Sequence, residues 1–273
     1  MSEKNIWKCR DKKIKYGNKI LIMGIVNVTP DSFSDGGEHF LVNDAVNRAL
    51  ELEKDGADII DIGAQSTRPG HTPVTDKEEW ARLEPVLSAL KGKLSVPLSV
   101  DTYYPIVAEN ALKSGADIIN DVSGVVSQNM AKIVKKERAG WIITHNGPAI
   151  PNDVKSFFEK SIEDCLNFGI EKNQICFDMG IGFGKNYDEN MTLLANVSEY
   201  KISTYPLLLG TSRKRVIGQG SNQENPKERI FGNIAADTAA IFGGVDIIRL
   251  HDVKNEKQGI LMAQNIRGYI NNG

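Results

Sequence analysis

The chain has 273 residues, of which 41% are hydrophobic and 25% charged, enough apolar material for a sizeable core and ordinary for a soluble enzyme. A formal net charge of −2 argues against a basic face for nucleic acid or an anionic membrane. The cysteines Cys9, Cys165 and Cys176 show no ligand-like spacing, and the charged N-terminus lacks a signal-peptide core, so we expect reduced thiols in a cytoplasmic protein.

Eight short apolar segments, each ending in a polar residue, predict the strands. The first, "KILIMGIVN" at 19–27, leads into the polar stretch "VTPDSFSDGG". The others are "GADIIDIG" at 56–63, "VPLSVDT" at 96–102, "GADIINDVSG" at 115–124, "AGWIITHN" at 139–146, "QICFDMG" at 174–180, "YPLLLGTS" at 205–212 and "GVDIIRLHD" at 244–252. Most are continuously apolar, as expected when both faces of a parallel strand are covered.

Helical patterns lie between these strands, at 42–55, 76–91, 105–113, 127–138, 153–169, 188–199, 227–243 and 254–271. Asp76 and Asp153 are the expected N-caps. Glycine is expected to end helices in the left-handed conformation at Gly56, Gly92, Gly115, Gly140 and Gly169.

Eight strand-then-helix units in about 250 residues predict an α/β fold, a (β/α)8 TIM barrel. We expect a single domain over residues 1–273, with residues 1–18 as an N-terminal extension. A doubly wound sheet remains the alternative, since alternation alone does not prove that the sheet closes.

Nearly every predicted strand finishes in a hydrogen-bonding or charged residue. These ends are Asn27, Asp61, Asp101 with Thr102, Asn120 with Asp121, His145, Asp178, Ser212 to Lys214, and Arg249 with His251. One such residue is usually a turn former, but eight converging on one mouth of a barrel predict a polar ligand site. The acceptors follow other strands than the cations Lys214, Arg249 and His251, which favours a ligand with a donor-rich end and an anionic end.

Seven motifs in order carry a resemblance to a known family. They are "MGIVNVTPDSFSDGG" at 23–37, "DIGAQSTRPG" at 61–70, "SVDT" at 99–102, "INDVSG" at 119–124, "FDMGIGFGK" at 177–185, "LLGTSRKRVIG" at 208–218 and "RLHDV" at 249–253. Over nearly its whole length the sequence resembles the dihydropteroate synthase family of pterin-binding barrels. The resemblance implies a Mg²⁺-dependent transferase that joins a dihydropterin diphosphate to p-aminobenzoate in folate synthesis. It also implies a homodimer formed through helices on the far side of the barrel.

The resemblance also implies roles for individual residues. The pterin set is Asp101, Asn120, Asp178 and Lys214; the diphosphate set is Asn27, Arg249 and His251, with Asn27 also binding Mg²⁺; the p-aminobenzoate set is Phe33, Thr67, Arg68, Pro69 and Ser212. Asp101, Lys214, Arg249 and His251 are the implied catalytic residues. In this family the bond to diphosphate breaks largely before the amine attacks, so the polar loop bearing Phe33 is expected to cover the cation that forms.

The sequence departs from the family pattern at four places. Gln65 stands where Glu is usual, Met179 replaces a usual Pro, and "THNGP" at 144–148 replaces a segment of the "HMQG" type. Leu250 replaces a usual Val, which is a conservative change. Two other functions stay open: a pterin-dependent methyltransferase on the same barrel, and a catalytically silent pterin-binding module. The intact "TPDSF" loop and the cations Lys214, Arg249 and His251 favour the synthase over both.

Overall fold

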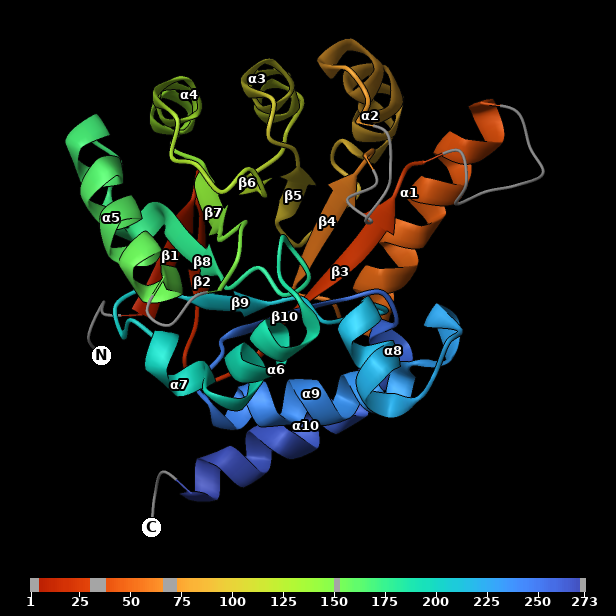
Figure 1. The fold of residues 1–273 in the computed structure, drawn as a ribbon. Helices are drawn as coiled ribbons and strands as arrows, with labels where there is room; N and C mark the ends of the chain where they lie inside the picture. The colour runs from red at the N-terminus through yellow and green to blue at the C-terminus, as the bar shows by residue number, and fades with distance from the viewer. Residues whose placement is uncertain (1–4, 30–37, 66–72, 150–152, 271–273) are drawn as a thin grey trace.

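The computed structural model describes residues 5–29, 38–65, 73–149 and 153–270 and contains a closed barrel of eight parallel strands ringed by helices (Figure 1). The barrel strands are β3 (Leu21–Asn27), β4 (Ile59–Gly63), β5 (Leu98–Asp101), β6 (Ile118–Asp121), β7 (Gly140–Thr144), β8 (Ile175–Asp178), β9 (Leu207–Leu209) and β10 (Ile247–Leu250). β10 pairs with both β3 and β9, which closes the sheet. The predicted (β/α)8 barrel is therefore confirmed, and the doubly wound alternative is excluded.

Helices follow the strands at the predicted places, with two differences. They are α1 (Glu38–Asp55), α2 (Asp76–Leu90), α3 (Pro105–Lys113), α4 (Gln128–Glu137), α5 (Asp153–Phe168), α6 (Tyr187–Ala195), α7 (Val197–Tyr200), α8 (Arg215–Ser221), α9 (Ile230–Phe242) and α10 (Val253–Ile270). The single helix expected at 188–199 is two, because Asn196 leaves the helical conformation and its side-chain amide donates to the Thr192 carbonyl. The short α8 was not predicted. No helix in the described ranges combines the length and apolarity needed to cross a bilayer.

Side chains on the strands alternate between two apolar layers. One layer lies between strands and helices and includes Ile60, Ile119 and Ile248. The other fills the barrel near the strand beginnings and includes Ile59, Ile118, Ile142, Cys176, Leu208 and Ile247. Because strand side chains alternate with a period of two, the continuous apolar runs in the sequence serve both layers.

An N-terminal hairpin covers the barrel end where the strands begin. β1 (Ile6–Cys9) and β2 (Lys12–Lys15) pair antiparallel, and Trp7 lies fully buried in the same cluster as the inner strand residues. The indole Nε1 of Trp7 donates to the Gln174 carbonyl at 2.8 Å. The sequence predicted only an N-terminal extension over residues 1–18, so this hairpin was missed.

Two local predictions were wrong. The N-cap of α2 is Thr75 rather than Asp76: its Oγ1 accepts from the Glu78 N–H at 3.2 Å, and Glu78 accepts in return from the Thr75 N–H. Asp153 is likewise the first helical residue of α5 and not its cap.

Gly140 does not end a helix. Arg138 takes the left-handed conformation there, with φ 53°, and Gly140 begins β7. A Cβ on Gly140 would lie 2.5 Å from Sγ of Cys9, so glycine is required by the approach of the hairpin. Gly56, Gly92, Gly115 and Gly169 do have positive φ, as predicted.

Candidate active site

At the other end of the barrel the inward-facing positions become polar and form one network. Arg249 on β10 donates from Nε to Oδ2 of Asp61 on β4 at 2.7 Å, and from Nη2 to Oδ2 of Asp101 on β5 at 2.8 Å. Asn120 on β6 donates to the same Asp61 oxygen at 3.2 Å. Side chains from four strands thus form one hydrogen-bonded network around Arg249.

The pKa values of Asp101 and Arg249 in this network are shifted from their ordinary values. Burial raises the pKa of Asp101 to about 7, although the charge of Arg249 lowers it. Burial alone would lower the pKa of Arg249, but Asp61 and Asp101 outweigh that effect and raise it. Asp61 is fully buried and was noted in the sequence only as a strand end, so its role as the partner of Arg249 is a new element of the site.

The loop after β8 holds the second acid and its cation. Asp178 accepts from the Gly180 N–H at 2.9 Å, and burial raises its pKa while Lys214 lowers it. Lys214 donates to the Ile181 carbonyl and lies 4.6 Å from the centroid of the Phe183 ring. Burial lowers the pKa of Lys214 to about 8, against the opposing effect of Asp178.

Glycines make this loop a close cradle for Lys214. Gly180, Gly182 and Gly184 all have positive φ, and a Cβ on Gly182 would stand 3.2 Å from Cδ of Lys214. Lys185 fastens the loop, because its Nζ donates to the carbonyls of His145, Gly180 and Phe183 at 2.9–3.1 Å. The glycines of "GIGFGK" therefore shape the cation site.

His251 lies just after β10 between two other predicted site residues. Its Nδ1 lies 3.0 Å from Oγ of Ser212, which also accepts the His251 backbone N–H at 3.1 Å. Its Nε2 lies 3.4 Å from Nδ2 of Asn27, at the end of β3. These contacts bring together Asn27 and His251, which the sequence assigned to the diphosphate, and Ser212, which it assigned to p-aminobenzoate.

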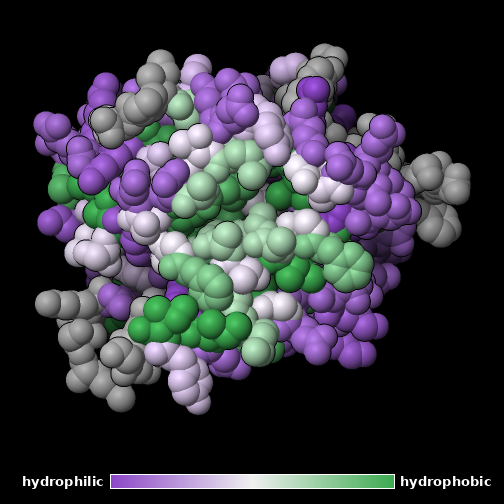
Figure 2. Space-filling model, turned by 60° about the horizontal axis from the view of Figure 1, so that its bottom comes forward, coloured by the Kyte–Doolittle hydropathy of each residue, from purple (hydrophilic) through white to green (hydrophobic). Residues whose placement is uncertain are grey.

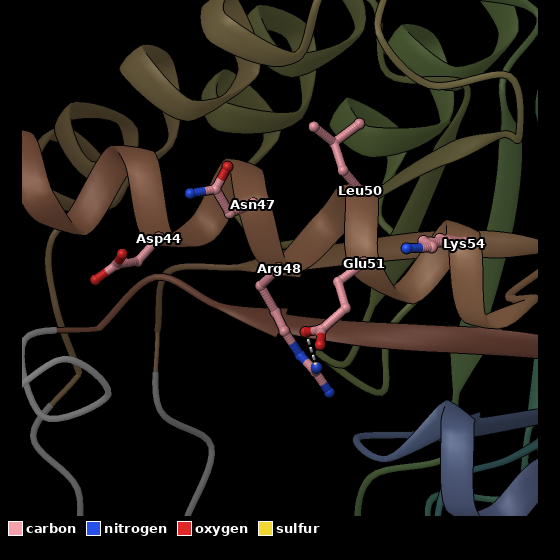
Figure 3. Close-up of a pocket in the computed structure, with 6 residues that line it drawn as sticks. All are labelled: Asp44, Asn47, Arg48, Leu50, Glu51 and Lys54. Carbon is pink, nitrogen blue, oxygen red and sulfur yellow. Dashed lines mark hydrogen bonds and ion pairs between the residues drawn. The ribbon is translucent and has the colours of Figure 1, made fainter.

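A depression in the surface lies along α1 (Figure 3). Its lining comes from one helix: Asp44, Asn47, Arg48, Leu50, Glu51 and Lys54. Arg48 pairs with Glu51 there and donates from Nη2 to the His251 carbonyl at 2.7 Å. The described residues that line the depression all belong to one helix, whereas a binding site usually gathers polar groups from several elements. The depression is therefore relevant to the site through the hydrogen bond from Arg48 to His251.

The predicted site residues fall into two groups. Asn27, Asp101, Asn120, Asp178, Ser212, Lys214, Arg249 and His251 all lie at this end of the barrel. Phe33, Thr67, Arg68 and Pro69 lie outside the described residues. The sequence suggested that the acceptors and the cations lie apart and that a bound anion neutralises the cations. In the structure they are interleaved instead: Arg249 pairs with Asp61 and Asp101. This buried cation therefore has protein partners without a bound anion.

Two acceptor atoms in the network have no hydrogen-bond partner within the described part of the protein. Oδ1 of Asp61 and Oδ1 of Asn120 are buried without a hydrogen-bond partner among the described residues. Buried polar atoms are normally paired, so these two call for donors. The arrangement can therefore bind a flat, donor-rich heterocycle next to cations that can hold an anionic group.

Comparisons with known proteins agree with this geometry. The sequence matches the family described as "Pterin binding enzyme" over residues 23–251. It is 40% identical to the dihydropteroate synthase of Bacillus subtilis over 266 residues, covering 95% of this chain and 92% of that protein.

Solved structures give the same result. The fold matches a dihydropteroate synthase from Clostridium difficile crystallised in the presence of pteroic acid, with a TM-score of 0.88, 44% identity, and coverage of 93% of this chain and 98% of that one. It also matches the Xanthomonas albilineans enzyme in complex with 7,8-dihydropteroate, with a TM-score of 0.87, 34% identity, and coverage of 96% and 98%.

Proposed function

Because the chain belongs to the dihydropteroate synthase family of pterin-binding enzymes, we propose which of its residues perform the family's reaction and how. The protein is a transferase of folate biosynthesis, a dihydropteroate synthase. It condenses 6-hydroxymethyl-7,8-dihydropterin diphosphate with p-aminobenzoate and releases pyrophosphate. The observation that carries the residue assignments is the joint burial of unpaired acceptors and cations at one barrel end.

The pterin ring binds against Asp101, Asn120, Asp178 and Lys214 in this proposal. The carboxylates and Oδ1 of Asn120 accept the N–H donors of the ring, while Lys214 donates to its oxygen and nitrogen atoms. Support comes from the unpaired Asn120 oxygen and from the positive charge of Lys214 near Asp178. A ligand with several donors also favours the ionised form of Asp101, whose pKa of about 7 lies close to working pH.

The diphosphate lies at Asn27, Arg249 and His251. Two of the five donors of Arg249 are bonded to carboxylates, and the guanidinium has further N–H groups for phosphate oxygens. Asn27 turns Nδ2 toward His251, so its Oδ1 is the atom that would hold Mg²⁺. No group of three or more His, Cys, Asp or Glu in the described ranges could hold a metal, so the ion would rely on diphosphate oxygens and water. Bound Mg²⁺ supplies charge neutralisation to the leaving group.

Bond breaking precedes amine attack in this scheme. The bond between the pterin methylene and the diphosphate oxygen breaks, and its electron pair leaves with the diphosphate. Arg249 and His251 hold the departing charge, while the carboxylate of Asp101 stabilises the positive charge left on the pterin. The amine of p-aminobenzoate then attacks the methylene carbon and gives up one proton.

The p-aminobenzoate pocket is assigned to Ser212 together with Phe33, Thr67, Arg68 and Pro69. The assignment of the last four rests on the sequence motifs alone. Ser212 is supported by its place beside His251, which puts it next to the leaving group.

The decisive experiment combines the purified protein with the pterin diphosphate and p-aminobenzoate. Dihydropteroate should form only when both are present, with one pyrophosphate per product, and EDTA should suppress it. No product would support the silent module instead. Full turnover in EDTA would contradict the Asn27–Mg²⁺ assignment.

A homodimer through α9 and α10 is also proposed. These neighbouring helices expose large apolar side chains, including Phe231 at 83%, Met262 at 60% and Ile270 at 63%, and Figure 2 shows hydrophobic side chains gathered on this face. Contiguous exposed apolar surface of this kind marks an interface, and a second copy presents the same patch.

Sedimentation analysis tests this dimer. The wild type should sediment as a dimer, and Met262→Lys should shift it toward monomer. The matched change Ile106→Lys, at a residue 50% exposed on α3, should have no effect. A monomeric wild type at micromolar concentration would contradict the proposal.

The remaining expectations are a single domain and a cytoplasmic location. The three cysteines are free and buried, which supports a reducing compartment.

A further inference from the structure

The segment 211–214, between β9 and α8, is a tight turn that carries two of the proposed site residues. Ser212 lies beside His251, and Lys214 lies against the loop after β8. The Lys214 N–H donates to the Thr211 carbonyl at 3.0 Å, which closes the turn. Within it Arg213 has a φ of 62°, an uncommon conformation for a residue with a side chain. Such a conformation persists only where the surroundings hold it, so the contacts of this turn matter for both site residues.

Arg229, the residue directly before α9, holds the second half of the turn. Its Nη1 donates to the carbonyls of Arg213 at 2.8 Å and Lys214 at 3.2 Å. Its other two nitrogen atoms donate to two backbone carbonyls that follow α8. A Cβ on Gly218 would lie 2.5 Å from the guanidinium, so a side chain at that position would displace it. The backbone around the turn is therefore fitted closely to Arg229.

Asp237, two turns further along α9, holds the first half of the turn. Oγ1 of Thr211 donates to Oδ1 of Asp237 at 2.7 Å, and both residues are buried. Away from bulk water, loss of either partner leaves the other polar group unpaired, which makes a buried hydrogen bond costly to break. One helix thus fixes the turn at both of its ends.

A second buried acid, Glu256 on α10, lies near enough to Asp237 to sense its charge. Burial raises the pKa of Glu256 to about 8, and the charges of Asp237 and Asp252 raise it further. Burial also raises the pKa of Asp237 to about 7, although the Thr211 hydroxyl lowers it. Oδ2 of Asp237 and Oε2 of Glu256 have no hydrogen-bond partner within the described ranges. An acid protonated on Oδ2 still offers Oδ1, so Asp237 can accept from Thr211 without carrying a buried charge.

We propose that Asp237 is a positioning residue for the reaction: through Thr211 it fixes the turn 211–214 and hence the places of Ser212 and Lys214. The inference rests on the proposed function, because Ser212 and Lys214 have their roles there. Asp237 acts only through the turn and touches no substrate. Since the turn carries one residue assigned to the pterin and one assigned to p-aminobenzoate, its loss should affect turnover as a whole.

Two substitutions break the hydrogen bond, and two matched controls keep it. Thr211→Val removes the hydroxyl with little change of shape, and Asp237→Leu removes the acceptor. Thr211→Ser keeps the hydroxyl. Asp237→Asn keeps a carbonyl oxygen for Thr211 and carries no charge, so it imitates the protonated acid.

The first measurement is kcat with both substrates saturating. Thr211→Val and Asp237→Leu should each lower kcat about tenfold, the effect of a small displacement of the reacting groups. Thr211→Ser and Asp237→Asn should stay within about twofold of wild type. The double variant Thr211→Val/Asp237→Leu should also lose about tenfold and not about a hundredfold, because both changes remove the same hydrogen bond.

Thermal unfolding separates positioning from a general loss of structure. Thr211→Val leaves Oδ1 of Asp237 without its donor and should lower the unfolding temperature. The double variant removes that stranded acceptor, so its unfolding temperature should return toward wild type while kcat stays low. Recovery of kcat together with stability would overturn the proposal, as would wild-type kcat in both Thr211→Val and Asp237→Leu.

Hydrogen exchange of a peptide covering 211–214 gives a readout independent of turnover. Exchange should accelerate in Thr211→Val and in the double variant, and it should match wild type in Thr211→Ser and Asp237→Asn. Unchanged exchange in Thr211→Val would show that Asp237 does not hold the turn. Failure of the wild type to make dihydropteroate would instead remove the proposed function, while the exchange comparison would still decide whether Asp237 fixes the turn.

Discussion

The two ends of the barrel use the same strands for opposite purposes. On successive inward positions Ile59 is followed by Asp61, Ile118 by Asn120, Cys176 by Asp178, and Ile247 by Arg249. Two residues along a strand is about 6.6 Å, so the barrel interior changes from apolar to charged within one side-chain layer. The hairpin around Trp7 closes the apolar end, and the polar end holds the residues that we propose for binding and catalysis. We therefore expect substitutions in the apolar layer to lower stability and substitutions in the polar layer to lower turnover.

The largest expected effect is at the apolar end. Trp7→Ala should reduce the free energy of unfolding by about 3–5 kcal/mol, because it leaves a cavity under the barrel. Urea unfolding measures the loss. The folded variant should keep kcat/KM within about twofold of wild type at low temperature. Loss of turnover without loss of stability would mean that the two ends are not independent.

Lys214→Ala makes the corresponding test at the polar end, where turnover rather than stability should fall. Removing this cation should lower kcat by about 10² or more, the usual scale for one lost electrostatic contact. The free energy of unfolding should change less than in Trp7→Ala, because the cost of burying the cation, which lowers its pKa to about 8, offsets the loss of its contacts with Asp178 and the Ile181 carbonyl. The exposed lysine change Lys160→Ala is the control. Near-normal turnover of Lys214→Ala would refute the assigned role.

Gly140→Ala sharpens the comparison without removing any atom. The added methyl would stand 2.5 Å from Sγ of Cys9 and 3.1 Å from the Trp7 ring, so it should push the hairpin away and cost about 1–3 kcal/mol. Gly268→Ala, on α10 with no atom within 4 Å of the new methyl, should leave stability unchanged or slightly increased. Equal effects of the two substitutions would show that the hairpin does not seal the barrel.

The affinity of the polar end for the pterin should depend on pH. In the proposed site the ionised form of Asp101 binds the pterin, and its pKa of about 7 predicts that affinity falls as pH drops below that value. Lys214 loses its proton above about 8, so affinity should also fall on the alkaline side. Calorimetry should find a maximum between these values and a loss of about tenfold one unit outside them. The acidic loss should be smaller in Asp101→Asn, and a flat profile would contradict both assignments.

The sequence predicted the barrel, and it predicted that most of the candidate residues would lie at one end of it, because both follow from local patterns. Continuous apolar runs ending in polar residues are typical of parallel barrel strands, and the resemblance named the residues at their ends. The hairpin was missed because lysines and arginines alternate with Trp7, Cys9 and Ile14, which lowers its mean hydropathy. The period-two alternation was the signal that could have revealed it.

The pairing of side chains could not be predicted from the sequence, for a different reason. Arg249 meets Asp61 and Asp101 across 188 and 148 residues of chain, and the choice of partner depends on which rotamers the closed barrel allows. Arg48 donates to the backbone carbonyl of His251, and because every residue has such a carbonyl, no residue type in the sequence marks that contact. Such contacts needed the three-dimensional structure.

Calorimetric titration of the pterin substrate into wild type and Asp178→Asn tests the polar end most directly. Asn keeps a carbonyl oxygen for the Gly180 N–H but loses the charge that accepts the ring donors. The account predicts clear binding to wild type and none measurable in the variant, with matching unfolding curves. An unchanged affinity in Asp178→Asn would show that the pterin binds elsewhere.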